Sequence, residues 1–144
     1  MANNPHILVV DAPYYTEISA SLMDGVKEVF HREGASYDYV EVPGVLEIPA
    51  AVAMAISSDK NYEGYVVIGC VIRGETTHYD IVANESARAL MDLTVEHRIA
   101  LGNGIQTVEN EAQAWARAKK TEKNKGGGAA QAALDMISLK ASLG

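Results

Sequence analysis

Hydrophobic positions along the chain fall into short apolar runs that are separated by longer stretches with a helical repeat. Four segments have the length and pattern of β-strands: residues 6–10, 37–42, 65–72 and 99–108. The third, YVVIGCVI, is apolar throughout, which is typical of a strand covered on both faces. The fourth, IALGNGIQTV, is interrupted by glycines.

Helices are predicted between these strands. Thr16 can cap a helix that Gly34 ends. The apolar residues of this helix fall on one face and are Ile18, Leu22, Val26, Val29 and Phe30. Pro49 lies in the first turn of a second helix, where proline is well tolerated because the backbone N–H that it lacks has no helical partner there.

Three further helices are predicted in the second half of the chain. The first covers roughly residues 80–97, with Val82, Ala89, Leu90 and Leu93 on its buried side. Asn110 and Gln113 have the spacing of a capping box, which would start a helix that carries Trp115. A basic turn, KKTEKNKGGG, then leads into the last helix, AAQAALDMISLKASL.

The alternation of strands and helices predicts an α/β fold, in which helices cover both faces of a doubly wound, four-stranded parallel sheet. Ligands of such sheets bind beyond the C-terminal ends of the strands. The chain has 144 residues and shows no internal repeat or linker. We therefore expect a single domain over residues 1–144, which is long enough to bury a sizeable core.

The net charge and the cysteine content disfavour several kinds of binding partner and compartment. A net charge of −7 disfavours non-specific binding to nucleic acid or to an anionic membrane. The N-terminal stretch has only a four-residue apolar run, residues 7–10, which predicts neither a signal peptide nor a membrane span. The single cysteine, Cys70, excludes an intrachain disulfide and suits a reducing compartment such as the cytoplasm, and no zinc-ligand spacing occurs.

The C-terminal end of each predicted strand carries unusual residues. The four segments are residues 11–15, 42–49, 73–78 and 102–104. Because the C-terminal ends of parallel strands meet at one edge of a sheet, we expect these segments to form one cluster.

The segment after Arg73 is suited to an oxyanion. Gly74 permits close approach of a ligand to the backbone, and the amides and hydroxyls of Thr76 and Thr77 lie at a predicted helix N-terminus, whose dipole favours negative charge. The two threonines can equally serve only as helix caps. The imidazole of His78 can exchange protons with a bound substrate near neutral pH, although a histidine at a helix start is often purely structural.

Several other motifs are excluded. The Gly102-Asn103-Gly104 segment lacks the third glycine and the strand–helix context of a dinucleotide fingerprint, and no phosphate-loop lysine motif occurs. A receiver domain would place a phospho-accepting aspartate where the third strand has Cys70. Arg117 and Lys125 can form a solvated basic face, or they can face a site that binds phosphate.

Taken together, these segments resemble the lumazine synthase family over essentially the whole chain. The matching motifs are VPGVLEIP, GCVIRGETTHYD, VANESARAL, GNGIQTVENEAQAWARA and NKGGGAA, in the order and at the spacing of the family. The resemblance implies a flavodoxin-like subunit that forms homopentamers, some of which build larger shells. It also implies a condensation that needs no cofactor: 5-amino-6-(D-ribitylamino)uracil and 3,4-dihydroxy-2-butanone 4-phosphate give 6,7-dimethyl-8-ribityllumazine, phosphate and water.

The resemblance also implies roles for individual residues. His78 matches the general acid/base, Glu75 and Thr76 match the phosphate loop, and Arg117, contributed by a neighbouring subunit, matches the arginine that neutralises the leaving phosphate. Glu47 matches the acid that binds the ribityl chain. The remaining predicted contacts are Tyr14, which would stack on the pyrimidine, Tyr15, Val45, Leu46, Cys70, Val71, Ile72 and Asn103 for the substrate, and Lys125 in the family's Asn-Lys-Gly motif.

Some positions depart from the commonest family pattern, and other functions stay open. Leu46 replaces a frequent phenylalanine, Asn103 replaces an aromatic that closes over the ligand, and Gln106 is polar at an apolar position. The first alternative is a flavin- or lumazine-binding module without catalysis. The second is the related riboflavin synthase that shares the scaffold, and the third is a structural shell protein.

Overall fold

The computed structural model describes residues 4–144, so the part of the N-terminal prediction that concerns residues 1–3 lies outside the described residues. It contains a sheet of four parallel strands in the order β2-β1-β3-β4. The strands are β1 (His6–Ala12), β2 (Ser36–Glu41), β3 (Gly64–Ile72) and β4 (Leu101–Val108). The predicted flavodoxin-like α/β fold is confirmed.

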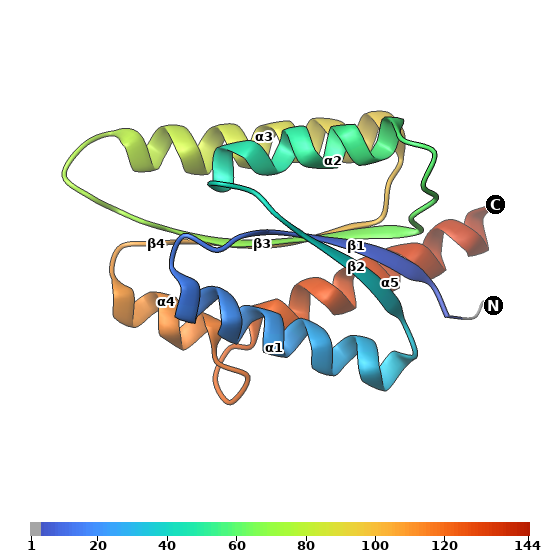
Figure 1. Cartoon of the computed structure of the whole chain (residues 1–144), viewed down its shortest axis with the longest axis horizontal. Coiled ribbons are helices and arrows are strands. Elements are labelled where there is room, and N and C mark those ends of the chain that lie inside the picture. Colours follow the sequence, from blue (N-terminus) through green and yellow to red (C-terminus); the bar gives the residue numbers. More distant parts are fainter. Residues whose placement is uncertain (1–3) are drawn as a thin grey trace.

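Helices cover both faces of the sheet (Figure 1). One face carries α1 (Thr16–Glu33), α4 (Glu111–Ala118) and α5 (Lys125–Leu143). The other carries α2 (Ile48–Ser57), which follows a 3₁₀ turn over Val45–Glu47, and α3 (His78–His97). No helix within the described residues is long and apolar enough to cross a membrane.

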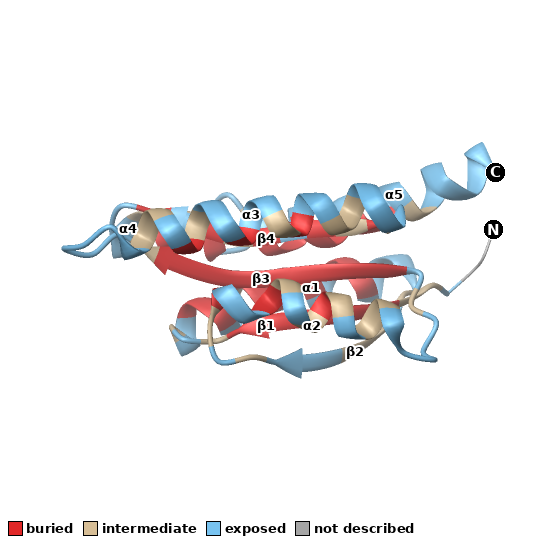
Figure 2. Cartoon of the chain, turned by 90° about the horizontal axis from the view of Figure 1, so that it is seen from above, coloured by how far each residue is buried: buried red, intermediate tan, exposed pale blue. Residues whose placement is uncertain are grey.

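Each face of the sheet has its own hydrophobic core, because side chains alternate along a strand. On β3, Val66, Ile68 and Cys70 pack with α1, α4 and α5, whereas Tyr65, Val67 and Val71 pack with α2 and α3. This strand is buried along almost its whole length, as predicted, whereas β2 is an exposed edge strand (Figure 2).

Two predicted helix starts are wrong. Tyr15, not Thr16, occupies the N-cap position of α1, and no side chain caps this helix. The last helix begins at Lys125, four residues before the predicted alanine run, so the three glycines of the basic turn are helical. Two other termini behave as predicted: Gly34 ends α1 in the left-handed conformation with φ 75°, and the Asn110 side chain accepts a 2.9 Å hydrogen bond from Gln113 N.

Candidate active site

A cavity of about 470 Å³ lies at the C-terminal ends of β1 and β3. The chain after β1 leads to β2 on one side, whereas β3 and β4 lie on the other, so this is the point at which the strand order reverses. The cavity is lined by Tyr14, Tyr15, Pro43, Gly44, Val45, Leu46, Glu47, Cys70, Val71, Ile72, His78 and Val82. Three separated segments of the chain therefore meet here, as the sheet rule predicts.

The end of β3 forms an apolar wall of the cavity. Cys70 and Val71 are buried, and Ile72 is half-buried. Burial raises the pKa of the Cys70 thiol to about 11, so the thiol stays protonated at neutral pH and is a poor nucleophile. This wall is suited to contact a flat organic ring rather than to perform covalent chemistry.

The segment between β2 and α2 forms a second wall of the cavity, and its one charged side chain is Glu47. Val45 is buried and Ile48 is fully buried, which anchors the 3₁₀ turn to the core. Leu46 and Glu47 are exposed on this anchored turn, so the Glu47 carboxylate is presented to the cavity without a buried partner. Such a carboxylate can accept hydrogen bonds from the hydroxyls of a ligand.

Two tyrosines after β1 close a third side. Their rings meet edge to face, with centroids 5.0 Å apart and an angle of 84° between the ring planes. Tyr14 is 74% exposed, whereas Tyr15 is half-buried and packs against the core, which raises the pKa of its phenol. Tyr15 thus holds the exposed ring of Tyr14 in place for a stacking contact.

His78 is the first residue of α3 and lies on the rim of the cavity. The Thr76 hydroxyl accepts a 3.2 Å hydrogen bond from the His78 backbone N–H, so this threonine serves as a local cap, whereas the Thr77 side chain does not cap the helix. Glu75 and Thr76 do not line the cavity but lie in the exposed loop that joins Ile72 to His78. The helix N-terminus behind this loop favours an anion next to the imidazole.

Arg117 and Lys125 do not reach this cavity within one chain. Arg117 is half-buried on α4, where its guanidinium donates a 3.1 Å hydrogen bond to the Gln113 carbonyl, and Lys125 is the exposed first residue of α5. Both helices cover the face of the sheet opposite to α3 (Figure 1). The N-terminal end of α3 and helix α4 nevertheless lie at the same end of the molecule.

Comparison with known proteins shows the family of the chain. Residues 4–141 match the profile of a family described as 6,7-dimethyl-8-ribityllumazine synthase. A protein of this name from Bartonella bacilliformis is 61% identical over 143 residues, covering 98% of this chain and 93% of the relative. Another from Bartonella tribocorum is 58% identical, covering 100% and 95% of the two chains. The chain belongs to the 6,7-dimethyl-8-ribityllumazine synthase family. A relative from Rhizobium meliloti, named 6,7-dimethyl-8-ribityllumazine synthase 1, is 59% identical and covers 96% and 94%.

Within this lumazine synthase fold, Asn103 does not lie where the strand-end pattern predicted. Strand β4 continues to Val108, so residues 102–104 lie in its first half and not at its C-terminal end. Asn103 is exposed, and its side chain accepts a 2.9 Å hydrogen bond from Ile105 N. Gly102 is required for packing, because a Cβ there would lie 1.8 Å from the Ala129 carbonyl oxygen of α5.

Three lining residues of this lumazine synthase pocket were not predicted as site residues: Pro43, Gly44 and Val82. Pro43 and Gly44 belong to residues 42–49, one of the four segments predicted to cluster, so their place in this segment could have identified them as lining residues. Val82 was predicted only as a buried residue of the helix. Because a side chain one turn after His78 points to the same face of α3, helical spacing could have added it.

Proposed function

We propose that the chain catalyses the condensation of 5-amino-6-(D-ribitylamino)uracil with 3,4-dihydroxy-2-butanone 4-phosphate, which gives 6,7-dimethyl-8-ribityllumazine, phosphate and water. This is the penultimate step of riboflavin biosynthesis and makes the chain a transferase. The observation that carries the proposal, beside family membership, is one cavity that joins Tyr14, Glu47 and His78 from three segments at the switch point of the sheet.

The reaction needs proton transfers and a place for phosphate, but no enzyme nucleophile. An amine of the pyrimidine adds to the ketone and a first water leaves. Elimination of phosphate then leaves a second carbonyl group in the four-carbon chain, and the second amine closes the ring on this carbonyl with loss of a second water. His78 moves protons at the rim of the cavity. Glu47 holds the ribityl hydroxyls, and Tyr14 stacks on the pyrimidine ring against the apolar wall of Cys70, Val71 and Ile72.

Phosphate binding is assigned to the loop with Glu75 and Thr76, completed by Arg117 and Lys125 of a neighbouring copy. A shared site is supported by the placement of Arg117 and His78 on opposite faces of one sheet. The exposed Asn103 then faces the neighbouring pocket instead of its own. The proposed assembly is a homopentamer or a larger assembly of pentamers, in the cytoplasm.

Purified protein incubated with both substrates should form a product with lumazine absorbance and fluorescence. His78→Ala should lower kcat without abolishing turnover, because holding two substrates together contributes by itself, up to about 7–11 kcal/mol in favourable models. Folding and substrate binding are checked in parallel by circular dichroism and calorimetry. If the His78→Ala protein folds and binds both substrates but reacts only at the rate of the uncatalysed mixture, then holding the substrates together does not by itself accelerate the reaction, and this prediction is wrong.

The same assay separates the other functions. A catalytically idle flavin- or lumazine-binding protein would bind the product without forming it, and a riboflavin synthase would consume lumazine supplied alone. A shell protein would do neither. The absence of product with both substrates present would refute the proposed function.

A further inference from the structure

We infer that Arg73 is a positioning residue, which fastens the loop carrying Glu75, Thr76 and His78 to the end of β4 and the start of α4. The inference rests on the proposed function for its consequence in catalysis, but the contacts themselves do not depend on it. Arg73 follows directly after β3 and does not line the cavity.

The Arg73 guanidinium contacts three side chains of its own chain, while the Arg73 side chain stays 39% exposed. Its Nε donates a 2.8 Å hydrogen bond to Glu109, and its two terminal nitrogens lie 3.4 Å from the two Asp80 oxygens. Its Cζ lies 4.3 Å from the centroid of the Tyr79 ring. The hydrogen bonds to Glu109 and Asp80 raise the pKa of Arg73 further, so its charge is permanent and shared by two carboxylates. Its Nε–H and one N–H of each terminal nitrogen are therefore directed at protein carboxylates.

Besides the Arg73 side chain, one backbone hydrogen bond of 2.9 Å, from the Arg73 N–H to the Val108 carbonyl, ties the start of the loop to β4. Residues 73–78 are all exposed, and a Cβ added at Gly74 would meet no atom within 4 Å. Packing therefore does not fix the backbone of this loop. The Arg73 side chain fixes both ends of the loop. Its contact with Glu109 ties the start of the loop to the end of β4, and its contacts with Tyr79 and Asp80 tie it to the first turn of α3. His78 lies in the sequence between Arg73 and its partners Tyr79 and Asp80, so these contacts restrict the position of the His78 backbone.

The contacts of Arg73 continue to Arg117 through hydrogen bonds. The Glu109 N–H donates to the Gln113 side chain at 2.7 Å, and the Arg117 guanidinium donates to the Gln113 carbonyl at 3.1 Å. One chain thereby connects its own phosphate loop to the arginine that it contributes to the neighbouring pocket in the proposed assembly.

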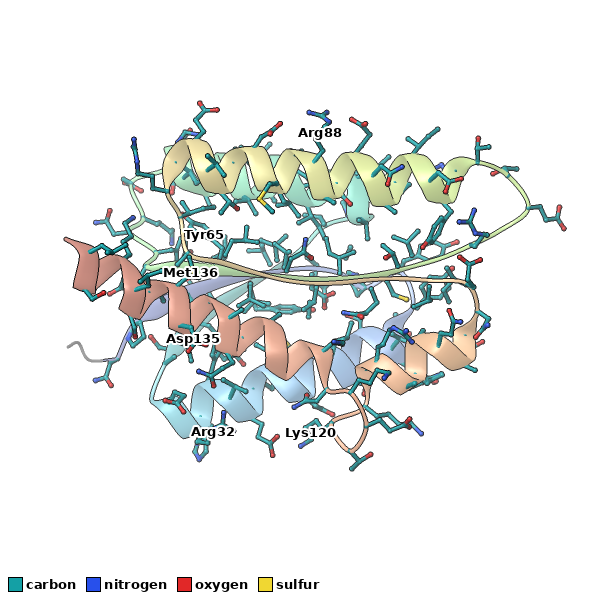
Figure 3. The ribbon with its side chains drawn as sticks, turned by 180° about the vertical axis from the view of Figure 1, so that it is seen from behind. Arg32, Tyr65, Arg88, Lys120, Asp135 and Met136 are labelled. Atoms are coloured by element: carbon teal, nitrogen blue, oxygen red, sulfur yellow. The ribbon has the colours of Figure 1, made fainter. Side chains whose placement is uncertain are left out.

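Arg88 offers a matched control. It is also an exposed arginine that bridges two carboxylates on α3, at 2.7 Å from Glu85 and 3.2 Å from Asp92. It lies on the outer side of the helix, away from the sheet (Figure 3). Replacing Arg88 removes a similar pair of surface ion pairs, which contribute little to stability, and leaves the contacts of the loop over residues 73–78 unchanged.

The test compares Arg73→Gln, Glu109→Gln, the double variant and Arg88→Gln in the full-length protein. Amide hydrogen exchange is measured without substrate at Arg73, His78 and Asp80, whose N–H groups donate hydrogen bonds to Val108, Thr76 and Thr77, and kcat and KM are measured for each substrate. Arg73→Gln should speed exchange in the loop about tenfold and raise KM for the phosphate substrate about tenfold, because small displacements of reacting groups are costly. Arg88→Gln should change neither by more than about twofold.

The double variant should be no worse than Arg73→Gln alone, because Arg73→Gln already removes the contact that Glu109→Gln weakens. Arg73→Lys should fall between the original protein and Arg73→Gln, since an ammonium keeps the charge but cannot span both carboxylates. Unchanged exchange in Arg73→Gln, equal effects of Arg73→Gln and Arg88→Gln, or additive losses in the double variant would each overturn the inference. If the unaltered protein makes no lumazine, the proposed function fails, and the exchange measurement still decides the role of Arg73.

Discussion

At the scale of single residues, Asp11 shows how the alternation of side chains along a strand decides which face of the sheet a residue serves. It is 1% exposed, and its carboxylate accepts hydrogen bonds from the Ser19 hydroxyl at 2.6 and 2.7 Å and from the Tyr39 hydroxyl at 2.5 Å. On β1, Ile7 and Val9 face α1, so Asp11 faces it too. Asp11 belongs to the segments that the sequence predicted to cluster, yet it points away from the cavity.

The Asp11 network predicts a pH dependence of stability. Burial raises the pKa of this carboxyl, the hydrogen bonds from Ser19 and Tyr39 partly oppose the rise, and the charge of Glu41 adds to it. Because the folded-state pKa lies above 3.8, the folded state keeps a proton that the unfolded chain has lost. Asp11 therefore destabilises the fold increasingly as pH rises from about 4 through the folded-state pKa, by about 1.4 kcal/mol for each unit of pKa difference.

Urea unfolding of the original protein and of Asp11→Asn at several pH values measures this effect. The difference in free energy of unfolding, original minus variant, should fall as pH rises from about 4 to 7. Asp24→Asn, at an exposed position of α1, is the control for the loss of a carboxylate without burial. A difference that stays constant or grows for Asp11→Asn would contradict the assigned direction.

At the scale of elements, the close contact between α1 and α5 explains the glycines before the last alanine run. Gly126 is buried against the backbone of Leu22, and a Cβ at Gly126 would lie 2.0 Å from the Leu22 carbonyl oxygen. Gly128, two residues later on the same helix, has open space around its Cα. Glycine weakens a helix by itself, so the helix depends on this packing and on Asn124, whose side chain accepts a 3.2 Å hydrogen bond from Gly127 N.

These two glycines should respond in opposite ways to alanine. Gly126→Ala should lower the free energy of unfolding by about 2–3 kcal/mol, because two backbones must separate to admit a methyl group. Gly128→Ala should raise it by about 0.5–1 kcal/mol, because alanine favours the helix and meets no neighbour. Chemical denaturation of both variants under the same conditions makes the comparison, and equal shifts of the same sign would contradict it.

The same helix shows where prediction from the sequence fails and why. Periodicity gave all four strands and five helices, because burial of alternating or helical faces leaves a direct mark on the residues. The start of α5 was missed because local propensity disfavours three consecutive glycines, whereas the tertiary contact with α1 requires at least one of them. The capping box of α4 was found because it is local: its donors and acceptors lie within residues 109–113.

At the scale of the whole molecule, the two faces of the sheet divide the predicted site. Tyr14, Glu47 and His78 were brought together correctly, since parallel topology alone places strand ends side by side. Family resemblance assigned Arg117 and Asn103 to the same chemistry, but no pattern within one chain says which copy supplies them. Arg117 is separated from the cavity by the connection after β4, which takes the chain to the other face of the sheet, whereas Asn103 lies in the first half of β4 itself.

A shared pocket predicts recovery of activity when two defective variants are assembled together. Arg117→Ala should raise KM for the phosphate substrate, and His78→Ala should lower kcat. In a mixed assembly, some pockets combine the intact His78 of one copy with the intact Arg117 of the next. Since the two copies are drawn at random, about a quarter of the pockets in an equal mixture are intact.

The two variants are co-expressed with different affinity tags, and assemblies that carry both tags are isolated and assayed at a low concentration of the phosphate substrate. Their rate should exceed the mean of the two parents and approach about a quarter of the unaltered rate. The control is a mixture of the two variants made after separate purification, in which no exchange of copies has occurred, and it should give the mean. If co-assembled variants also give only the mean, both residues serve a pocket within one chain and the neighbouring copy contributes no arginine.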